Sequence, residues 1–187
     1  MELIRPKTLD EALGMMSAAP MTPLAGGTDV YPAFTNGAKL GKLIDISRIE
    51  DFQRSIRLDG DTWLISPHVT WSDVLAANLP PQFDGLKSCA SEIGGRQIQN
   101  RATVIGNICN ASPAADGVVA MLSLDARLRL ASSRGERLIS LDEFIRGNRS
   151  TLREPDELLV EIQIRDRRGT IGSAFTKLGA RRYLVIS

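Results

Sequence analysis

The chain has little of the chemistry that most metal sites and acid–base sites need. Its 187 residues contain two cysteines and one histidine. Cys89 and Cys109 form no CxxC pair and are too few for a four-thiolate iron–sulfur cluster. The single histidine, His68, argues against a zinc site or a histidine-based catalytic site. We therefore expect no metal site and no catalytic residue here, and any cluster to lie on another chain.

Long apolar runs and an excess of one charge are also missing. No apolar run approaches the roughly 20 residues that span a bilayer, and Met1 leads into Glu2 and a segment interrupted by Pro6 instead of a signal peptide. We expect no membrane span and a cytoplasmic location. The 23 basic and 22 acidic side chains give a formal charge of +1, which does not favour a nucleic-acid partner. With 43% hydrophobic residues, the chain can bury a real core.

Residues 1–54 predict a small α/β lobe at the start of an α+β fold. Leu3 and Ile4 form a short strand, and the capping-box pattern Thr8-Leu9-Asp10-Glu11 begins a helix that runs to about Ser17. A short helix over residues 30–34 and an alternating strand over residues 42–46 follow. The lobe closes within residues 48–54.

Residues 55–178 predict a larger lobe with a mixed sheet. Strands flank the Asp59-Gly60-Asp61 turn of a hairpin. Ser112 is expected to be the N-cap of a buried helix over residues 116–124, with Pro113 at its first turn. Trp63 and Trp71 are expected to be packing residues. Other helices are expected at about 70–77 and 82–93, and other strands at 127–130, 138–139, 158–164 and 174–178.

The segment Gly26-Gly27-Thr28-Asp29 lies between a strand and a helix. Glycine lets the backbone approach a ligand closely, and a helix start presents free N–H donors, so this arrangement can hold a pyrophosphate. A plain tight turn is the alternative, because Gly-Gly connectors are common in α/β folds. The pattern is not GxGxxG, which disfavours a Rossmann site.

A second segment, from Gly94 to Ser112, has about twenty residues without obvious structure. Connections this long inside a compact domain are usually functional, because their backbone polar groups need partners. The alternative is that Ser112 and Asp116 only cap the next helix.

Taken together, three segments resemble the FAD-binding domain of the molybdopterin dehydrogenase family. They are Ala25-Gly26-Gly27-Thr28-Asp29, Ile98-Gln99-Asn100-Arg101-Ala102-Thr103-Val104-Ile105-Gly106-Asn107 and Ala111-Ser112-Pro113-Ala114-Ala115-Asp116. Relatives in this family include the flavin domain of xanthine dehydrogenase and the medium subunit of carbon monoxide dehydrogenase. The likeness continues through Glu157-Leu158-Leu159 to Arg181-Arg182 and covers nearly the whole chain in order.

The resemblance implies a two-lobed FAD-binding domain of the PCMH, or vanillyl-alcohol-oxidase-like, type. The cofactor would lie between the lobes, with one loop around its pyrophosphate, a second nucleotide-contacting loop, and Asp116 accepting a hydrogen bond from it. Leu159 would pack near the isoalloxazine ring with Lys177 beside it; without the resemblance they read as a core strand residue and a solvated lysine. Ile93 is a less securely aligned contact. The implied FAD-binding residues are Leu24, Ala25, Gly26, Gly27, Thr28, Asp29, Val30, Thr103, Val104, Ile105, Gly106, Asn107, Asp116, Leu159 and Lys177.

The chain departs from the family pattern in two ways. The family reads Thr-Ile-Gly-Gly-Asn where this chain has Thr103-Val104-Ile105-Gly106-Asn107. If that backbone needs positive φ, Ile105 would be strained by about 1 to 3 kcal/mol. Relatives also continue with a further C-terminal domain, so residues 179–187 are expected to begin a domain that is truncated.

By resemblance, the chain is an FAD-dependent oxidoreductase subunit of a molybdenum hydroxylase. A large partner would hold the molybdenum centre, a small partner would hold 2Fe-2S clusters, and FAD here would pass electrons to NAD or another acceptor. One alternative is a degenerate, flavin-free assembly subunit of the same complex. Another is a free-standing FAD oxidoreductase related to the vanillyl-alcohol-oxidase flavoproteins.

Overall fold

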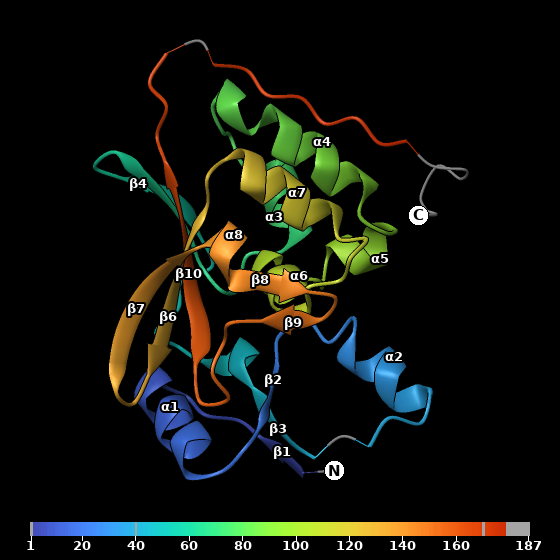
Figure 1. Cartoon of the computed structure of the whole chain (residues 1–187), viewed down its shortest axis with the longest axis vertical. Helices are drawn as coiled ribbons and strands as arrows, with labels where there is room; N and C mark the ends of the chain where they lie inside the picture. The colour runs from blue at the N-terminus through green and yellow to red at the C-terminus, as the bar shows by residue number, and fades with distance from the viewer. Residues whose placement is uncertain (1, 40, 170, 179–187) are drawn as a thin grey trace.

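The computed structural model describes residues 2–39, 41–169 and 171–178, and its N-terminal part is a small parallel sheet (Figure 1). Strand order is β1-β3-β2, with all three strands parallel. Two helices make the crossovers that parallel neighbours require. The elements are β1 (Glu2–Ile4), α1 (Leu9–Ala18), β2 (Thr22–Leu24), α2 (Val30–Thr35) and β3 (Lys42–Asp45).

Helix α1 begins where its sequence predicts. The Thr8 hydroxyl accepts a hydrogen bond from the N–H of Glu11, and the Glu11 carboxylate accepts one from the N–H of Lys7. These bonds satisfy donors that the first turn of a helix leaves free. The buried face of α1 carries Ala12, Leu13 and Met16. Helix α2 differs, because none of its residues is buried.

The rest of the chain builds a five-stranded sheet covered by helices (Figure 1). All four of its strand pairs are antiparallel, so the expectation of a mixed sheet is wrong. Strand order is β4-β5-β10-β6-β7, and the Gly60 turn joins the first two strands as predicted. The strands are β4 (Ile56–Asp59), β5 (Thr62–Ile65), β6 (Arg127–Ser132), β7 (Gly135–Ser140) and β10 (Leu158–Arg165). The hairpin β8 (Ile145–Gly147) and β9 (Ser150–Thr151) forms a separate pair.

Helices α3 to α7 cover one side of this sheet (Figure 1). They are α3 (Trp71–Ala76), α4 (Asp84–Glu92), α5 (Arg96–Gln99), α6 (Val104–Asn110) and α7 (Asp116–Ser123). Helix α8 (Leu141–Phe144) and the 3-10 turns η1 (Ile46–Arg48) and η2 (Pro81–Phe83) complete the described elements. Trp71 is fully buried in the main apolar cluster and Trp63 packs edge-on against Phe83, so both tryptophans are packing residues as predicted.

Three further expectations about these elements are wrong. The segment from Gly94 to Ser112 is not an unstructured connection, because α5 and α6 lie within it. Ser112 is not the N-cap of α7; its backbone and side-chain oxygens accept hydrogen bonds in a turn, and Ala115 is the N-cap. Residues 174–178 form no strand, because this stretch makes no ladder and instead runs along α4 (Figure 1).

The smaller apolar cluster lies between the N-terminal part and the large sheet. The smaller cluster joins α1 and η1 to three residues of the large sheet, Ala131, Leu158 and Val160. The expected truncated domain at 179–187 lies outside the described residues. Within the described part, no helix could span a membrane and no group of three or more residues could ligate a metal ion.

Candidate functional site

A cavity of about 370 Å³ lies where the two sheets and helix α6 meet. This volume is within the range of small-molecule pockets. Its walls come from the loop between β2 and α2, from residues 93–110, and from the start of β10 with the turn before it. The lining residues are Thr22, Pro23, Ala25, Gly26, Gly27, Thr28, Asp29, Val30, Ile46, Ile93, Ile98, Ala102, Thr103, Ile105, Gly106, Asn107, Cys109, Asn110, Arg153, Leu158 and Leu159.

The glycine loop, residues 25–29, lies against residues 101–102 so closely that a side chain does not fit. A Cβ built on Gly26 would lie 2.0 Å from the carbonyl oxygen of Arg101. Gly27 has a φ of +77°, which favours glycine, and a Cβ there would lie 2.5 Å from the Tyr31 ring. Both glycines are therefore required by the geometry of the wall.

The same loop presents unused donors. Within the described residues, the backbone N–H groups of Gly26, Gly27, Thr28 and Asp29 make no hydrogen bond. Four neighbouring N–H groups at a cavity wall are suited to an anion, which needs several donors at once.

Thr103 fixes the start of the opposite wall. Its side-chain oxygen accepts a hydrogen bond from the N–H of Gly106 at 3.0 Å and caps helix α6. Two backbone hydrogen bonds join this region to the start of α3. The N–H of Val104 donates to the carbonyl oxygen of Val69, and the N–H of Trp71 donates to the carbonyl oxygen of Ala102. The Thr103 cap and the hydrogen bonds to the start of α3 therefore both hold this wall in place.

Ile105 lies in the first turn of α6, so the expected positive-φ strain is absent. A right-handed helix accepts a β-branched side chain with little cost. The side chain is 3% exposed, belongs to the main apolar cluster and also borders the cavity. Ile105 thus gives this wall of the cavity an apolar surface.

A β-bulge shapes the third wall. The register of β10 against β6 shifts between Leu159 and Glu161, which leaves Val160 without a directly paired residue. Leu158, Leu159 and Val160 are consecutive and all buried, which a regular alternating strand with one solvent face does not produce. Leu158 packs in the smaller apolar cluster and Leu159 in the larger one, and both border the cavity.

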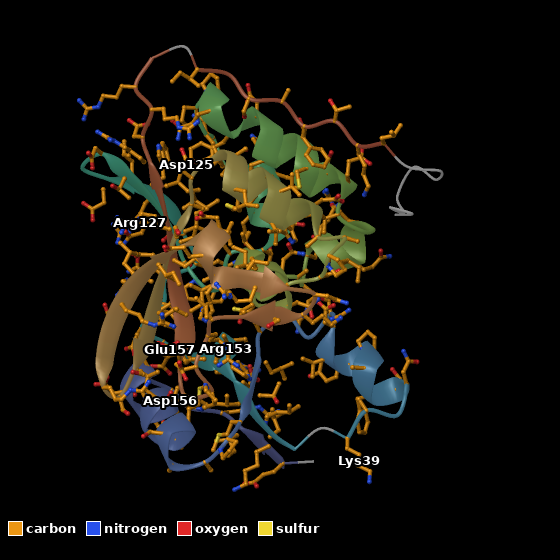
Figure 2. All side chains as sticks on the ribbon, in the orientation of Figure 1. Lys39, Asp125, Arg127, Arg153, Asp156 and Glu157 are labelled. Carbon is orange, nitrogen blue, oxygen red and sulfur yellow. The ribbon has the colours of Figure 1, made fainter. Side chains whose placement is uncertain are left out.

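Among the described lining residues, Arg153 and Asp29 carry the charges. One guanidinium nitrogen of Arg153 donates to the carbonyl oxygens of Glu154 and Glu157, at 3.1 and 2.7 Å. Figure 2 labels Arg153 beside Glu157, just before β10. No other bond of this guanidinium is made within the described residues, so its remaining N–H groups are free to bind a ligand.

Glu157 holds the turn that carries Arg153. Its buried carboxylate receives two hydrogen bonds from Arg137, at 2.6 and 2.8 Å, and one from the N–H of Glu154. Burial alone would raise the pKa of Glu157, but these bonds and the charge of Arg137 outweigh it and lower that pKa below its ordinary value of 4.5.

Cys109 also borders the cavity. Burial raises the pKa of its thiol to about 11, with the charge of Arg153 acting weakly in the opposite direction. The thiol is therefore protonated at neutral pH and is not an activated nucleophile. His68 contacts the carbonyl oxygen of Ile46 at 2.9 Å and packs against Phe52, which agrees with a structural residue.

The structure brings most of the predicted FAD-binding residues to this cavity. Those that line it are Ala25, Gly26, Gly27, Thr28, Asp29, Val30, Thr103, Ile105, Gly106, Asn107 and Leu159.

Four predicted residues do not line it. Leu24 and Val104 are buried in the core behind the walls. Asp116 and Lys177 form an ion pair with each other at 2.6 Å, away from the cavity lining. The contacts of Asp116 and Lys177 with FAD stay predictions.

Several lining residues were not predicted. Arg153 and Asn110 have polar side chains on the cavity, and Leu158, Ile98 and Ile46 add apolar surface. No local pattern marks Arg153, which reaches the site only because the turn before β10 folds back. Asn110 could have been predicted from the sequence, because it lies only three residues after Asn107, the end of the predicted second loop. Its side-chain amide does not cap a helix and is therefore available for another role.

The arrangement defines a class of protein: an α+β domain that holds a cofactor where two sheets and a helix meet. Comparison with similar proteins identifies this class more closely. Residues 1–164 match the family described as the FAD binding domain in molybdopterin dehydrogenase, and the chain belongs to that family. The α+β class expected from the sequence and FAD as the cofactor are confirmed.

The chain is similar to FAD subunits of dehydrogenases. It is 35% identical over 196 positions to the nicotinate dehydrogenase FAD-subunit of Eubacterium barkeri, covering 100% of this chain and 65% of that subunit. It is 29% identical to the xanthine dehydrogenase FAD-binding subunit of Escherichia coli O157:H7, covering 98% and 64%. The chain thus spans slightly less than two thirds of these relatives.

The fold is shared with a solved relative. Carbon monoxide dehydrogenase from Hydrogenophaga pseudoflava, in a form that lacks the Mo-pyranopterin moiety of the molybdenum cofactor, superimposes with a TM-score of 0.90. Sequence identity is 29%, over 97% of this chain and 64% of that chain.

The residues present fit FAD. The free N–H groups of the glycine loop suit its diphosphate. Asn107 borders the cavity, but its buried Oδ1 atom, which has no hydrogen-bond donor among the described residues, faces the interior, where it would lie 2.5 Å from a Cβ built on Gly117 of α7.

Proposed function

We propose that the chain is the FAD-binding electron-transfer subunit of a molybdenum hydroxylase. The glycine loop and helix α6, nearly 80 residues apart in sequence, face each other across one cavity, and this observation carries the proposal. Residues 25–30 would hold the diphosphate and Arg153 would add a cation, while Thr103 to Asn107 and Leu159 would form the rest of the site.

FAD supplies the redox chemistry of such a subunit when it is bound. The chain itself binds the cofactor, excludes water with Ile105, Leu158 and Leu159, and fixes its charge environment through Arg153. Among the described residues that line the cavity there is no histidine and no pair of carboxylates, and we assign no residue a proton-transfer role.

The partners follow from the relatives. Their names describe FAD subunits and a medium chain of dehydrogenases. We propose a large partner that hydroxylates the organic substrate at molybdenum, a small partner with 2Fe-2S clusters, and NAD or another compound as the acceptor. The PCMH type of the fold, the lobe boundary at residue 54, the contacts of Asp116 and Lys177 with FAD, and the cytoplasmic location stay predictions.

Titration of the purified chain with FAD tests the binding role. Quenching of flavin fluorescence and a bound yellow cofactor are expected, and no binding at tens of micromolar FAD would overturn the role for this chain. Purification of the native complex with metal analysis tests the partners, because molybdenum and iron should then accompany the chain.

A degenerate, flavin-free assembly subunit is the second candidate, since Ile105 adds bulk to the cavity wall. Ile105→Gly and Ile105→Ala both remove that bulk, with circular dichroism to establish folding. A large gain in FAD affinity over the parent chain would favour degeneration, whereas unchanged or weaker binding would favour the flavoprotein.

A further inference from the structure

Three hydrogen-bonded side chains lie at the cavity. The amide nitrogen of Asn110 donates to Asp29 at 2.8 Å, and a guanidinium nitrogen of Arg149 donates to the amide oxygen of Asn110 at 2.7 Å. Asp29 and Asn110 both line the cavity, while Arg149 lies in the turn between β8 and β9. We call these three side chains the relay.

Asp29 does not use its carboxylate locally. It is the N-cap residue of α2, a position where aspartate usually accepts from the next turn, yet it makes no such bond. The carboxylate instead binds Asn110, 81 positions along the chain. Asp29 therefore makes a long-range contact with Asn110 in place of the local capping bond.

Asn110 is chemically suited to the middle position. An amide carries a donor and an acceptor, and here the nitrogen donates to a carboxylate while the oxygen accepts from a guanidinium. An alanine can make neither bond.

Arg149 is held in an uncommon backbone conformation. Its φ is +51°, and its N–H donates to the carbonyl oxygen of Ala111, which has a φ of +44°. Left-handed conformations at non-glycine residues are costly and persist where surrounding contacts enforce them. The β8–β9 turn is thus tied to the end of α6 by both backbone and side chain.

The glycine loop has few other attachments. Helix α2 buries none of its residues. Within the described residues, the Asn110–Asp29 bond is the hydrogen bond that joins residues 25–38 to another part of the fold. Removing it leaves the close packing of Gly26 on Arg101, and of Ala25 on the smaller apolar cluster, to keep the loop in place.

We propose that Asn110 and Arg149 are positioning residues that keep the glycine loop closed over the cavity and thereby slow the release of FAD. The effect on FAD release rests on the proposed function. The closure of the glycine loop does not depend on the cofactor.

The first experiment measures FAD dissociation from the chain by stopped-flow fluorescence. Asn110→Ala is expected to release FAD at least tenfold faster, because a hydrogen bond to a charged group is lost. Arg149→Ala, which keeps the Asn110–Asp29 bond, should give a smaller increase. Asn78→Ala, at an exposed asparagine outside the relay, is the matched control and should leave the rate unchanged.

A swapped pair tests the hydrogen bonds themselves. In Asp29→Asn combined with Asn110→Asp, the new amide at position 29 can donate to the new carboxylate at position 110, which still accepts from Arg149. The double variant should recover most of the slow release that Asn110→Ala loses. Release as fast as in Asn110→Ala would contradict the relay, as would a parental rate in Asn110→Ala.

Hydrogen exchange without FAD separates this proposal from the proposed function. The N–H groups of Tyr31 and Ala33 bond to Gly27 and Asp29 in the loop. Asn110→Ala should speed exchange of these amides in the FAD-free chain, and unchanged exchange would overturn loop closure by the relay. If the parent chain does not bind FAD but exchange still responds, the proposed function fails and the relay stands.

Discussion

Two glycines, Gly26 and Gly14, are under opposite steric constraints. A Cβ on Gly26 would meet the backbone oxygen of Arg101 at 2.0 Å, and backbone cannot rotate away as a side chain can. Gly14, in the middle of α1, has nothing within 4 Å of such a Cβ. The surroundings, and not the residue type, decide which glycine the fold needs.

Gly26→Ala is therefore expected to destabilise the chain by about 3 kcal/mol and to weaken FAD binding, since the glycine loop must move away from residues 101–102. Gly14→Ala is the control and should stabilise α1 by up to about 1 kcal/mol. Urea unfolding followed by circular dichroism measures both. Equal stability of the two variants would refute the close approach.

Arg153 gives a second prediction for a single residue. Arg153→Ala removes the cation of the cavity lining and should raise the Kd for FAD about tenfold, as loss of one charge-assisted contact does. Arg153→Lys keeps the charge and should recover part of the affinity. Fluorescence titration measures all three proteins; an unchanged Kd in Arg153→Ala would show that Arg153 does not contact the cofactor.

At the scale of elements, the turn from Leu152 to Glu157 supports the start of β10. Arg137 binds both the Glu157 carboxylate and the carbonyl oxygen of Leu152, so the turn is fixed from both ends. Because the folded-state pKa of Glu157 is lowered, its stabilising contribution is present above the unfolded value of 4.5 and is lost as pH falls through the folded value.

Glu157→Gln should accordingly cost about 1 to 2 kcal/mol at pH 7, because the buried Glu157 carboxylate loses its charge-assisted hydrogen bonds with the partly exposed Arg137. As the pH falls below 4.5 and through the lowered folded-state pKa of Glu157, the difference in stability between the two proteins should narrow, since the parental carboxylate then becomes protonated. Denaturant unfolding across pH 3–7 measures this. A gap that stays constant over the whole range would contradict a lowered pKa.

Elements with local signals were predictable, and those without were not. Helix α1 has its Thr8 cap, and the β4–β5 hairpin has its Gly60 turn. Helices α5 and α6 were missed because they have only four and seven residues, too short for an apolar period to appear. The strand expected at 174–178 does not form, because alternation of apolar and polar residues does not by itself provide a neighbouring strand to pair with.

At the scale of the whole molecule, the two sheets are not independent. Ala131, Leu158 and Val160 of the large sheet complete the apolar cluster of the N-terminal part. The cavity lies across the same junction, with walls from both parts. A ligand bound there stabilises the junction as well as the site.

We expect thermal unfolding in one transition, and a higher melting temperature with FAD. At a hundredfold excess over Kd, FAD should add about 2.7 kcal/mol of stability. Calorimetry with and without FAD measures both effects. Two separate transitions, with FAD shifting only one, would show that the N-terminal part unfolds by itself.

By itself, the sequence determined the local features: the glycine loop, the capped start of α1, the hairpin, and the motifs that place the chain in its family. These depend on residues within a few positions of one another. Only the tertiary structure decided that the glycine loop meets α6, that Arg153 borders the cavity, and that Asn110 binds Asp29. Such contacts join positions up to 81 residues apart, and they form because burial of the shared apolar core brings distant segments together.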